Sequence, residues 1–78
     1  MTFEFKISQD YFKRHLSLYY YCRRYVQDWG SYIEIRRKSD RSPVAWSLAS
    51  DMDARDMAEL RRWRAKGLGL RKRCGVVT

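Results

Sequence analysis

Cationic side chains are concentrated towards the end of the sequence, where their type and spacing suit the binding of an anion. Seven of them lie between residues 61 and 73, and they form what we name the C-terminal basic tract: Arg61, Arg62, Arg64, Lys66, Arg71, Lys72 and Arg73. No Asp or Glu follows Glu59. Cations near a helix end complement the helix dipole, but this explains only some of the seven. The others repel one another until negative groups meet them, so we expect this tract to contact an anionic partner.

A second, smaller group of cations surrounds a predicted turn, and we name it the turn basic tract: Arg36, Arg37, Lys38 and Arg41. A solvated loop explains this group as well as binding does. In the strand before the turn, Ile33 and Ile35 are predicted to face inward, and Tyr32, Glu34 and Arg36 outward. An outward tyrosine can stack on an unpaired base and an outward arginine can bind phosphate. The Gly-Phe-Gly-Phe-like run of RNA-recognition motifs does not occur here.

The overall charge points to the same class of partner. Seventeen Lys and Arg against nine Asp and Glu give a formal net charge of +8 over 78 residues. Such a charge attracts anions over a long range, and arginine pairs well with phosphate or carboxylate. The expected partners are therefore DNA or RNA, an acidic protein surface, or a nucleoprotein complex. A membrane is not expected, because no predicted helix is basic on one side and apolar on the other.

Residue types that support catalysis or metal binding are present without the partners that such sites need. His15 has no Ser or Cys at helical spacing. Asp51, Asp53 and Asp56 stand where a helix should begin, so capping explains them better than a cation site. Residues 67–69 lack the remainder of a phosphate-binding loop. We expect no enzyme, no metal site and no cofactor.

The two cysteines, Cys22 and Cys74, are far apart and form no CxxC motif. One histidine cannot complete a zinc site with them. We expect reduced thiols and a cytoplasmic location, since the chain also opens without a signal peptide and has no apolar run of membrane-spanning length. Its length predicts a single domain over residues 1–78.

The alternation and capping signals predict an α+β fold. The expected elements are a strand at 2–7, a helix at 9–29, a strand at 31–38, a strand starting at Val44, a helix from the acids at 51–53 to Gly67, and a strand at 69–77. Val44, Trp46 and Leu48 alternate with Ala45, Ser47 and Ala49 in the fourth element. This βαββαβ order predicts a ferredoxin-like fold, an antiparallel sheet with two helices on one face.

The stretch from residue 18 to residue 27 admits two interpretations. Steps of three and four favour a helix with one apolar side: Phe12, Leu16, Tyr19, Cys22, Val26 and Trp29. On that helix, the tyrosines at 19, 20, 21 and 25 are expected to lie mostly in or around the core. Tyrosine and valine nevertheless prefer strands, which favours the alternative.

In the alternative, residues 18–27, 31–38 and 43–49 form a three-stranded meander closed by a C-terminal helix at 53–66. This arrangement resembles the small sheet-plus-helix DNA-binding modules of the plant AP2 and integrase arm-binding type. The resemblance covers about half of the chain, in Trp29-Gly30, Tyr32-Ile33-Glu34-Ile35-Arg36, Val44-Ala45-Trp46 and the helix from Ala54 to Ala65. It implies a fold that binds DNA.

The function favoured by these patterns is nucleic-acid binding, with phosphates contacted by residues 61–73 and assisted by residues 36–41. Phosphate contacts read no sequence, so little base specificity is expected from these residues. The alternative is a small inhibitor or adaptor that docks on a protein or nucleoprotein complex. Chains of this size without catalytic residues are typical of phage-encoded antagonists of host systems, including anti-CRISPR proteins. A component of a ribonucleoprotein particle is a third possibility, and an exposed sheet edge would permit a homodimer.

Overall fold

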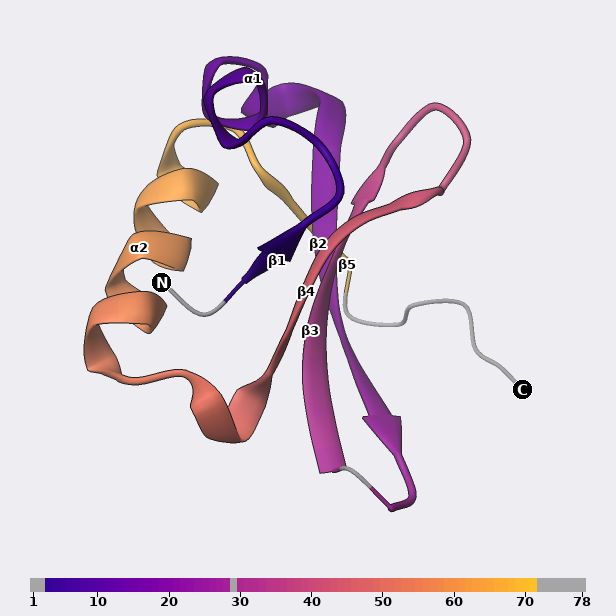
Figure 1. Ribbon diagram of the computed structural model, residues 1–78. Coiled ribbons are helices and arrows are strands. Elements are labelled where there is room, and N and C mark those ends of the chain that lie inside the picture. Colours follow the sequence, from indigo (N-terminus) through magenta and orange to yellow (C-terminus); the bar gives the residue numbers. More distant parts are fainter. Residues whose placement is uncertain (1–2, 29, 72–78) are drawn as a thin grey trace.

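The computed structural model describes residues 3–28 and 30–71, and it arranges them as one sheet with helices on one of its faces (Figure 1). The strands are β1 (Glu4–Phe5), β2 (Tyr19–Val26), β3 (Gly30–Arg37), β4 (Pro43–Leu48) and β5 (Gly69–Arg71). The helices are α1 (Gln9–Arg14) and α2 (Ala54–Ala65), with short 3₁₀ turns at Leu16–Leu18 and Ala49–Asp51. The predicted α+β class is confirmed.

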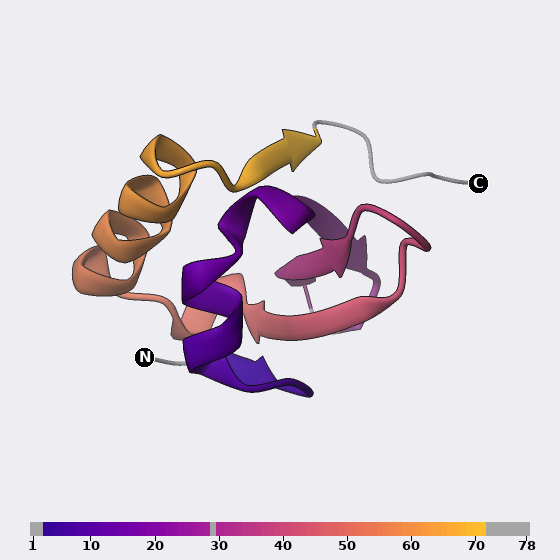
Figure 2. The ribbon, with the colours of Figure 1, turned by 90° about the horizontal axis from the view of Figure 1, so that it is seen from above.

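The sheet has the strand order β1-β4-β3-β2-β5. Its centre is an antiparallel meander in which β2 pairs with β3, and β3 with β4. The short strand β1 pairs antiparallel with β4, and β5 pairs parallel with β2 at the opposite edge. Figure 2 shows α1 and α2 together on one side of this sheet. We name the other side the open face.

The core lies between the sheet and the helices and is rich in aromatic rings. Phe12 of α1 and Trp63 of α2 meet edge to face with ring centroids 5.1 Å apart, and Phe3 lies 5.9 Å from Trp63. Ile33 and Ile35 of β3 are buried beneath them, as their alternation predicted. The expected inward side of the first strand is also confirmed, because Phe3, Phe5 and Ile7 all pack on this core.

The predicted helix at 9–29 is wrong beyond Arg14. Helix α1 ends there, and residues 19–26 form β2, in which every residue pairs with a residue of β3. The step-of-three pattern combined two different surfaces, since Phe12, Leu16 and Tyr19 reach the core whereas Cys22 belongs to the open face. In a strand, every residue of this stretch gains a cross-strand neighbour, and tyrosine prefers this conformation. Together these effects stabilise the strand more than burial of one apolar face would stabilise a helix.

This difference also changes the topology. The five-stranded order with a parallel β2–β5 pair is not the predicted ferredoxin-like arrangement of four antiparallel strands. The elements of the alternative interpretation agree well with β2, β3, β4 and α2. Of the last predicted strand, residues 69–71 form β5, and residues 72–77 lie outside the described residues.

Helix α2 is capped by two of the three predicted acids, Asp53 and Asp56, whereas Asp51 ends the preceding 3₁₀ turn and takes no part in the cap. The Asp53 carboxylate accepts a hydrogen bond from the Asp56 N–H at 2.9 Å, and the Asp56 carboxylate accepts one from the Asp53 N–H, which completes a capping box. At the other end, Gly67 has a φ of +129°, a left-handed conformation that glycine adopts at low cost. The following Leu68 is buried in the core and anchors the turn into β5.

Candidate anion-binding surface

The turn basic tract is held in place by a tight β3–β4 turn. The Arg37 N–H donates to the Ser42 carbonyl at 2.9 Å, and the Arg41 N–H donates to the Arg37 carbonyl at 2.8 Å. The Asp40 carboxylate accepts hydrogen bonds from both the N–H and the hydroxyl of Ser42, and these bonds lower the pKa of Asp40. Arg41 has a φ of +60°, which is uncommon for a residue other than glycine. The turn therefore holds a cationic side chain at a strained backbone position.

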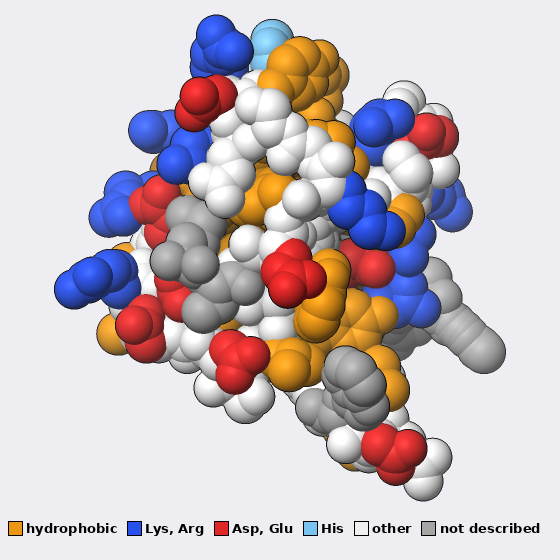
Figure 3. Space-filling model, viewed as in Figure 1, with side chains coloured by type: hydrophobic (Ala, Val, Ile, Leu, Met, Phe, Trp, Pro, Cys, Tyr) orange, Lys and Arg blue, Asp and Glu red, His pale blue; other side chains and the backbone are white. Residues whose placement is uncertain are grey.

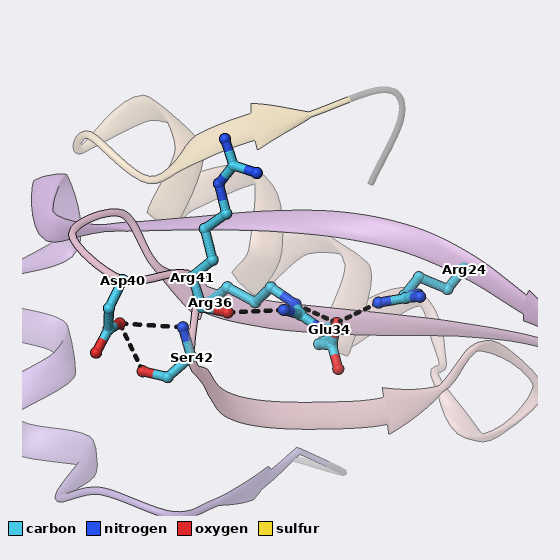
Figure 4. Close-up of polar contacts among 6 residues, drawn as sticks. All are labelled: Arg24, Glu34, Arg36, Asp40, Arg41 and Ser42. Atoms are coloured by element: carbon cyan, nitrogen blue, oxygen red, sulfur yellow. Dashed lines mark hydrogen bonds and ion pairs between the residues drawn. The ribbon is translucent and has the colours of Figure 1, made fainter. Parts of the chain in front are cut away.

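On the open face, three side chains form a charged ladder across β2 and β3 (Figure 4). Arg36 Nε donates to Glu34 Oε1 at 2.6 Å, and Arg24 Nη1 lies 3.4 Å from the same oxygen. The hydrogen bond with Glu34 is the main cause that raises the pKa of Arg36. Arg36 Nη1 also donates to the Arg41 carbonyl at 2.7 Å. One carboxylate is thus shared by two guanidinium groups, which leaves a net positive ladder joined to the turn.

The helical part of the C-terminal basic tract is divided between two flanks of α2. Arg64 lies on one flank, with its guanidinium 5.9 Å from the centre of the Tyr21 ring on β2. Arg61 is one turn away on the same flank, as the helical repeat of 3.6 residues requires. On the other flank Arg62 Nε donates to Glu59 Oε2 at 3.0 Å. This hydrogen bond lowers the pKa of Glu59, and the nearby charges of Lys13 and Lys66 lower it further.

The remainder of the tract continues into β5. Arg71 is the last described position of that strand, opposite Cys22 of β2, while Lys72 and Arg73 lie outside the described residues. Strand β5 also passes beside the turn basic tract. A Cβ added at Gly69 would lie 3.3 Å from Lys38 Cε and 3.2 Å from Tyr20 Cβ, so the Lys38 side chain crosses the start of β5.

Few of these cations are neutralised by the acids that precede them in the sequence. Between described residues, the ion pairs are Arg24–Glu34, Arg36–Glu34, Arg37–Asp40 and Arg62–Glu59. Of the acids at 51, 53, 56 and 59, only Glu59 pairs with the C-terminal basic tract in this part of the chain. Asp53 and Asp56 cap α2 instead. In the described part of the tract, Arg61, Arg64 and Lys66 therefore form no ion pair.

A further feature of the open face was not identified from the sequence. Val26, Tyr32, Trp46 and Leu48 line a shallow hollow with an almost entirely apolar surface. Figure 3 shows hydrophobic side chains gathered beside β3 and β4, with Lys and Arg side chains above them near the β3–β4 turn. The alternation in β4 was visible, but which of its two sides faced the helices was not. In the structure, Ala45 and Ser47 face the core, and Trp46 lies opposite Glu34 on the open face.

Most of the tyrosines at 19, 20, 21 and 25 lie in or around the core as expected, although they lie on a strand and not on a helix. Tyr19 and Tyr20 are buried and Tyr21 is partly buried, whereas Tyr25 is 71% exposed near the end of β2. Burial raises the pKa of Tyr19. Neighbouring residues in β2 point to opposite faces, so Tyr19 and Tyr20 cannot form one stacking surface.

The remaining candidate residues lie apart from this surface. His15 is exposed, with its ring 4.3 Å from that of Tyr11. Cys22 is completely buried and disulfide-bonded, which corrects the expected reduced thiol; Cys74 lies outside the described residues. Residues 3–28 and 30–71 contain no cluster of three or more side chains suited to a metal ion. In the same part of the chain, no helix combines the length and apolar character needed to cross a membrane.

Among the described residues the surface has three components: the turn basic tract, the cations of α2 and its C-terminal end, and an apolar hollow beside the Arg24–Glu34–Arg36 ladder. Such a surface can bind a ligand that presents negative groups to the cations and planar or apolar groups to the hollow. Comparisons of the chain with protein-family models, with curated proteins and with solved structures found no significant match.

Proposed function

We propose that this protein binds nucleic acid through its phosphates, using the C-terminal basic tract together with the turn basic tract. The observation that carries the proposal is the small extent of neutralisation. The acids nearest in sequence cap α2 or pair with Arg62, and they leave Arg61, Arg64 and Lys66 to solvent and to Tyr21. A positive surface of this kind gains binding free energy when its cations neutralise phosphates and release the counterions condensed on the nucleic acid.

The arrangement supports a shared surface made by both tracts. Lys38 extends from the turn to the start of β5, the strand that follows α2, so one nucleic-acid chain could run from α2 to the turn. Arginine is also the residue best suited to phosphate, because its planar group can form two parallel hydrogen bonds. Since phosphate contacts read no base sequence, we expect binding with little sequence preference.

Salt dependence tests this proposal directly. If five to seven phosphates are contacted, the affinity for nucleic acid should fall on the order of a hundred-fold or more between 50 and 200 mM salt. Fluorescence anisotropy of a labelled oligonucleotide measures this fall. An affinity that does not change with salt, or no binding at low salt, would contradict the proposal.

Matched variants locate the contact. The triple substitution Arg61→Gln, Arg64→Gln and Lys66→Gln should weaken nucleic-acid binding at least ten-fold, because three phosphate contacts are lost. Each lost contact should also lower the slope of log affinity against log salt concentration by about one. The control removes the same charge from exposed cations outside α2 and the turn, through Lys6→Gln, Arg14→Gln and Arg23→Gln. Equal weakening in both triple variants would show that net charge alone, and not this surface, determines binding.

Purification from the native cell, with and without nuclease, compares this proposal with the inhibitor or adaptor alternative. Co-purifying material that disappears after nuclease treatment supports nucleic-acid binding. A protein that stays bound after nuclease treatment, and is released by charge reversal of Arg61, Arg62 and Arg64, would instead support docking on a protein complex.

A further inference from the structure

The open face combines aromatic, apolar and cationic side chains within a small area. Tyr32 lies directly opposite Leu48, and Glu34 lies directly opposite Trp46, so the two aromatic residues are diagonal neighbours on adjacent strands. Diagonal positions on one face of a sheet are about 7–8 Å apart. Val26 completes the hollow from β2 and is 41% exposed. One short ligand segment can therefore touch both rings.

The chemistry of the hollow determines which form of nucleic acid it can accept. The outside of a duplex presents phosphates and sugars, and its base faces are stacked on one another. An apolar hollow gains little from such a surface. Unpaired bases have free π-faces, and they stack on tyrosine and tryptophan with little dependence on sequence. The hollow thus suits a single strand.

The charges around the hollow indicate how such a strand would lie. Arg24 and Arg36 border the hollow on β2 and β3, and Arg36 is connected to Arg41 through the Arg41 carbonyl. On the opposite border, Glu4 of β1 lies across from Trp46. A phosphate backbone is attracted to the first border and repelled from the second. The bases would then point towards β4.

We propose that the open face is a stacking platform for single-stranded nucleic acid, with Tyr32 and Trp46 each stacking on a base and Arg24, Arg36 and Arg41 following the backbone. This inference rests on the proposed function and adds the strand state of the ligand. It also gives the protein two modes of contact: the basic tracts bind phosphates of any nucleic acid, and the open face selects unpaired segments.

The test compares an oligothymidine with a blunt-ended duplex of equal length at 50 mM salt. Tyr32→Leu and Trp46→Leu should each weaken oligothymidine binding by about five-fold to a hundred-fold, the range found when a stacking ring is removed. Duplex affinity should remain within two-fold. Tyr32→Phe and Trp46→Phe keep a stacking ring and should restore most of the single-strand affinity.

Tyr25→Leu is the matched control, because Tyr25 is an exposed tyrosine on the opposite face of the same sheet. It should leave both affinities unchanged. The melting temperature of every variant is measured first, and the Phe variants keep the test valid if a Leu variant unfolds. Oligothymidine should also quench tryptophan fluorescence in the wild type, and Trp46→Phe should lose most of that quenching.

The possible outcomes separate the two proposals. Loss of single-strand binding with duplex binding retained supports the stacking platform. Unchanged binding in the Tyr32 and Trp46 variants overturns the platform and leaves phosphate binding intact. No binding of either ligand at low salt overturns both. Release of a nuclease-resistant protein partner by the same Leu variants would assign the hollow to protein docking and overturn the platform.

Discussion

Arg41 illustrates a conflict between backbone preference and side-chain chemistry. Its left-handed φ of +60° ends the β3–β4 turn, a position that glycine or asparagine occupies more readily. Its carbonyl accepts the hydrogen bond from Arg36, and Figure 4 shows its guanidinium extending to the side of the sheet where β5 lies. Backbone strain of this kind persists where the side chain has a role that offsets it.

Replacing Arg41 should therefore separate stability from binding. Arg41→Asn keeps a residue that tolerates the left-handed region, and we expect the free energy of unfolding to rise by a few tenths to about 1 kcal/mol. Nucleic-acid affinity should fall at the same time, because one cation is lost. Urea denaturation and anisotropy titrations measure the two effects. If affinity is unchanged, Arg41 has no part in binding.

Glu34 organises the open face, because a single carboxylate holds two arginines. Glu34→Gln should lower the free energy of unfolding by about 1 kcal/mol, since charge-assisted hydrogen bonds are lost and both guanidinium groups are partly exposed to screening solvent. Chemical denaturation measures this loss. Arg37→Gln removes only the exposed pair with Asp40 and should change stability by less than about 0.5 kcal/mol. Equal effects would show that the ladder is no stronger than an ordinary surface ion pair.

At the scale of elements, the first turn of α2 gives a prediction about pH. The backbone hydrogen bond from Asp56 lowers the pKa of the Asp53 carboxyl below its ordinary value of 3.8. Because the pKa is lower in the folded protein, the ionised Asp53 carboxylate stabilises the fold at pH values above the ordinary pKa of 3.8. This stabilisation is lost as the pH falls through the lower pKa of the folded state. Asp53→Asn keeps a capping side chain without the titration, so its stability should change less across this acidic range. Thermal melts between neutral and acidic pH provide the comparison. An identical acid response in both proteins would contradict this assignment.

The success of the sequence-based predictions differed between elements for identifiable physical reasons. Helix α2 was predictable, because Asp53, Asp56 and Gly67 supply local start and stop signals. The β3 strand was predictable from the alternation of Ile33 and Ile35 between outward residues. Strand β2 was not, because its conformation depends on pairing with β3, a contact that local periodicity does not contain.

The candidate site also has one part that the sequence predicted and one part that it did not. The basic tracts are visible as composition, and the structure adds that Lys38 reaches the start of β5. The apolar hollow was missed because it requires three strands in register: Val26 from β2, Tyr32 from β3, and Trp46 and Leu48 from β4. A sequence shows that such residues alternate, but it does not show which side of the strand the helices cover.

For the molecule as a whole, strand β5 completes the sheet and lies beside the turn basic tract. Strand β5 covers the outer edge of β2 from Tyr20 to Cys22, and Leu68 just before it fills the core. A chain ending at residue 66 should therefore melt at a lower temperature, because Leu68 leaves the core, and form larger species in size-exclusion chromatography, because the edge of β2 from Tyr20 to Cys22 becomes free to pair between molecules. A chain ending at residue 71 is the control. It also lacks Cys74, so a difference between the two reflects residues 67–71. Identical behaviour would show that β5 is dispensable.

The parallel pairing of β5 with β2 also has a consequence for biosynthesis. Its partners are far apart in the sequence, as Tyr20 and Gly69 show, so this contact cannot form until Gly69 has left the ribosome. The residues of the meander leave the ribosome earlier, when the backbone groups at the edge of β2 that pairs with β5 still lack their hydrogen-bond partners. Slowed translation or premature termination within this interval would prolong the exposure of that edge, and we expect nascent chains of this protein to depend on chaperones that bind extended segments.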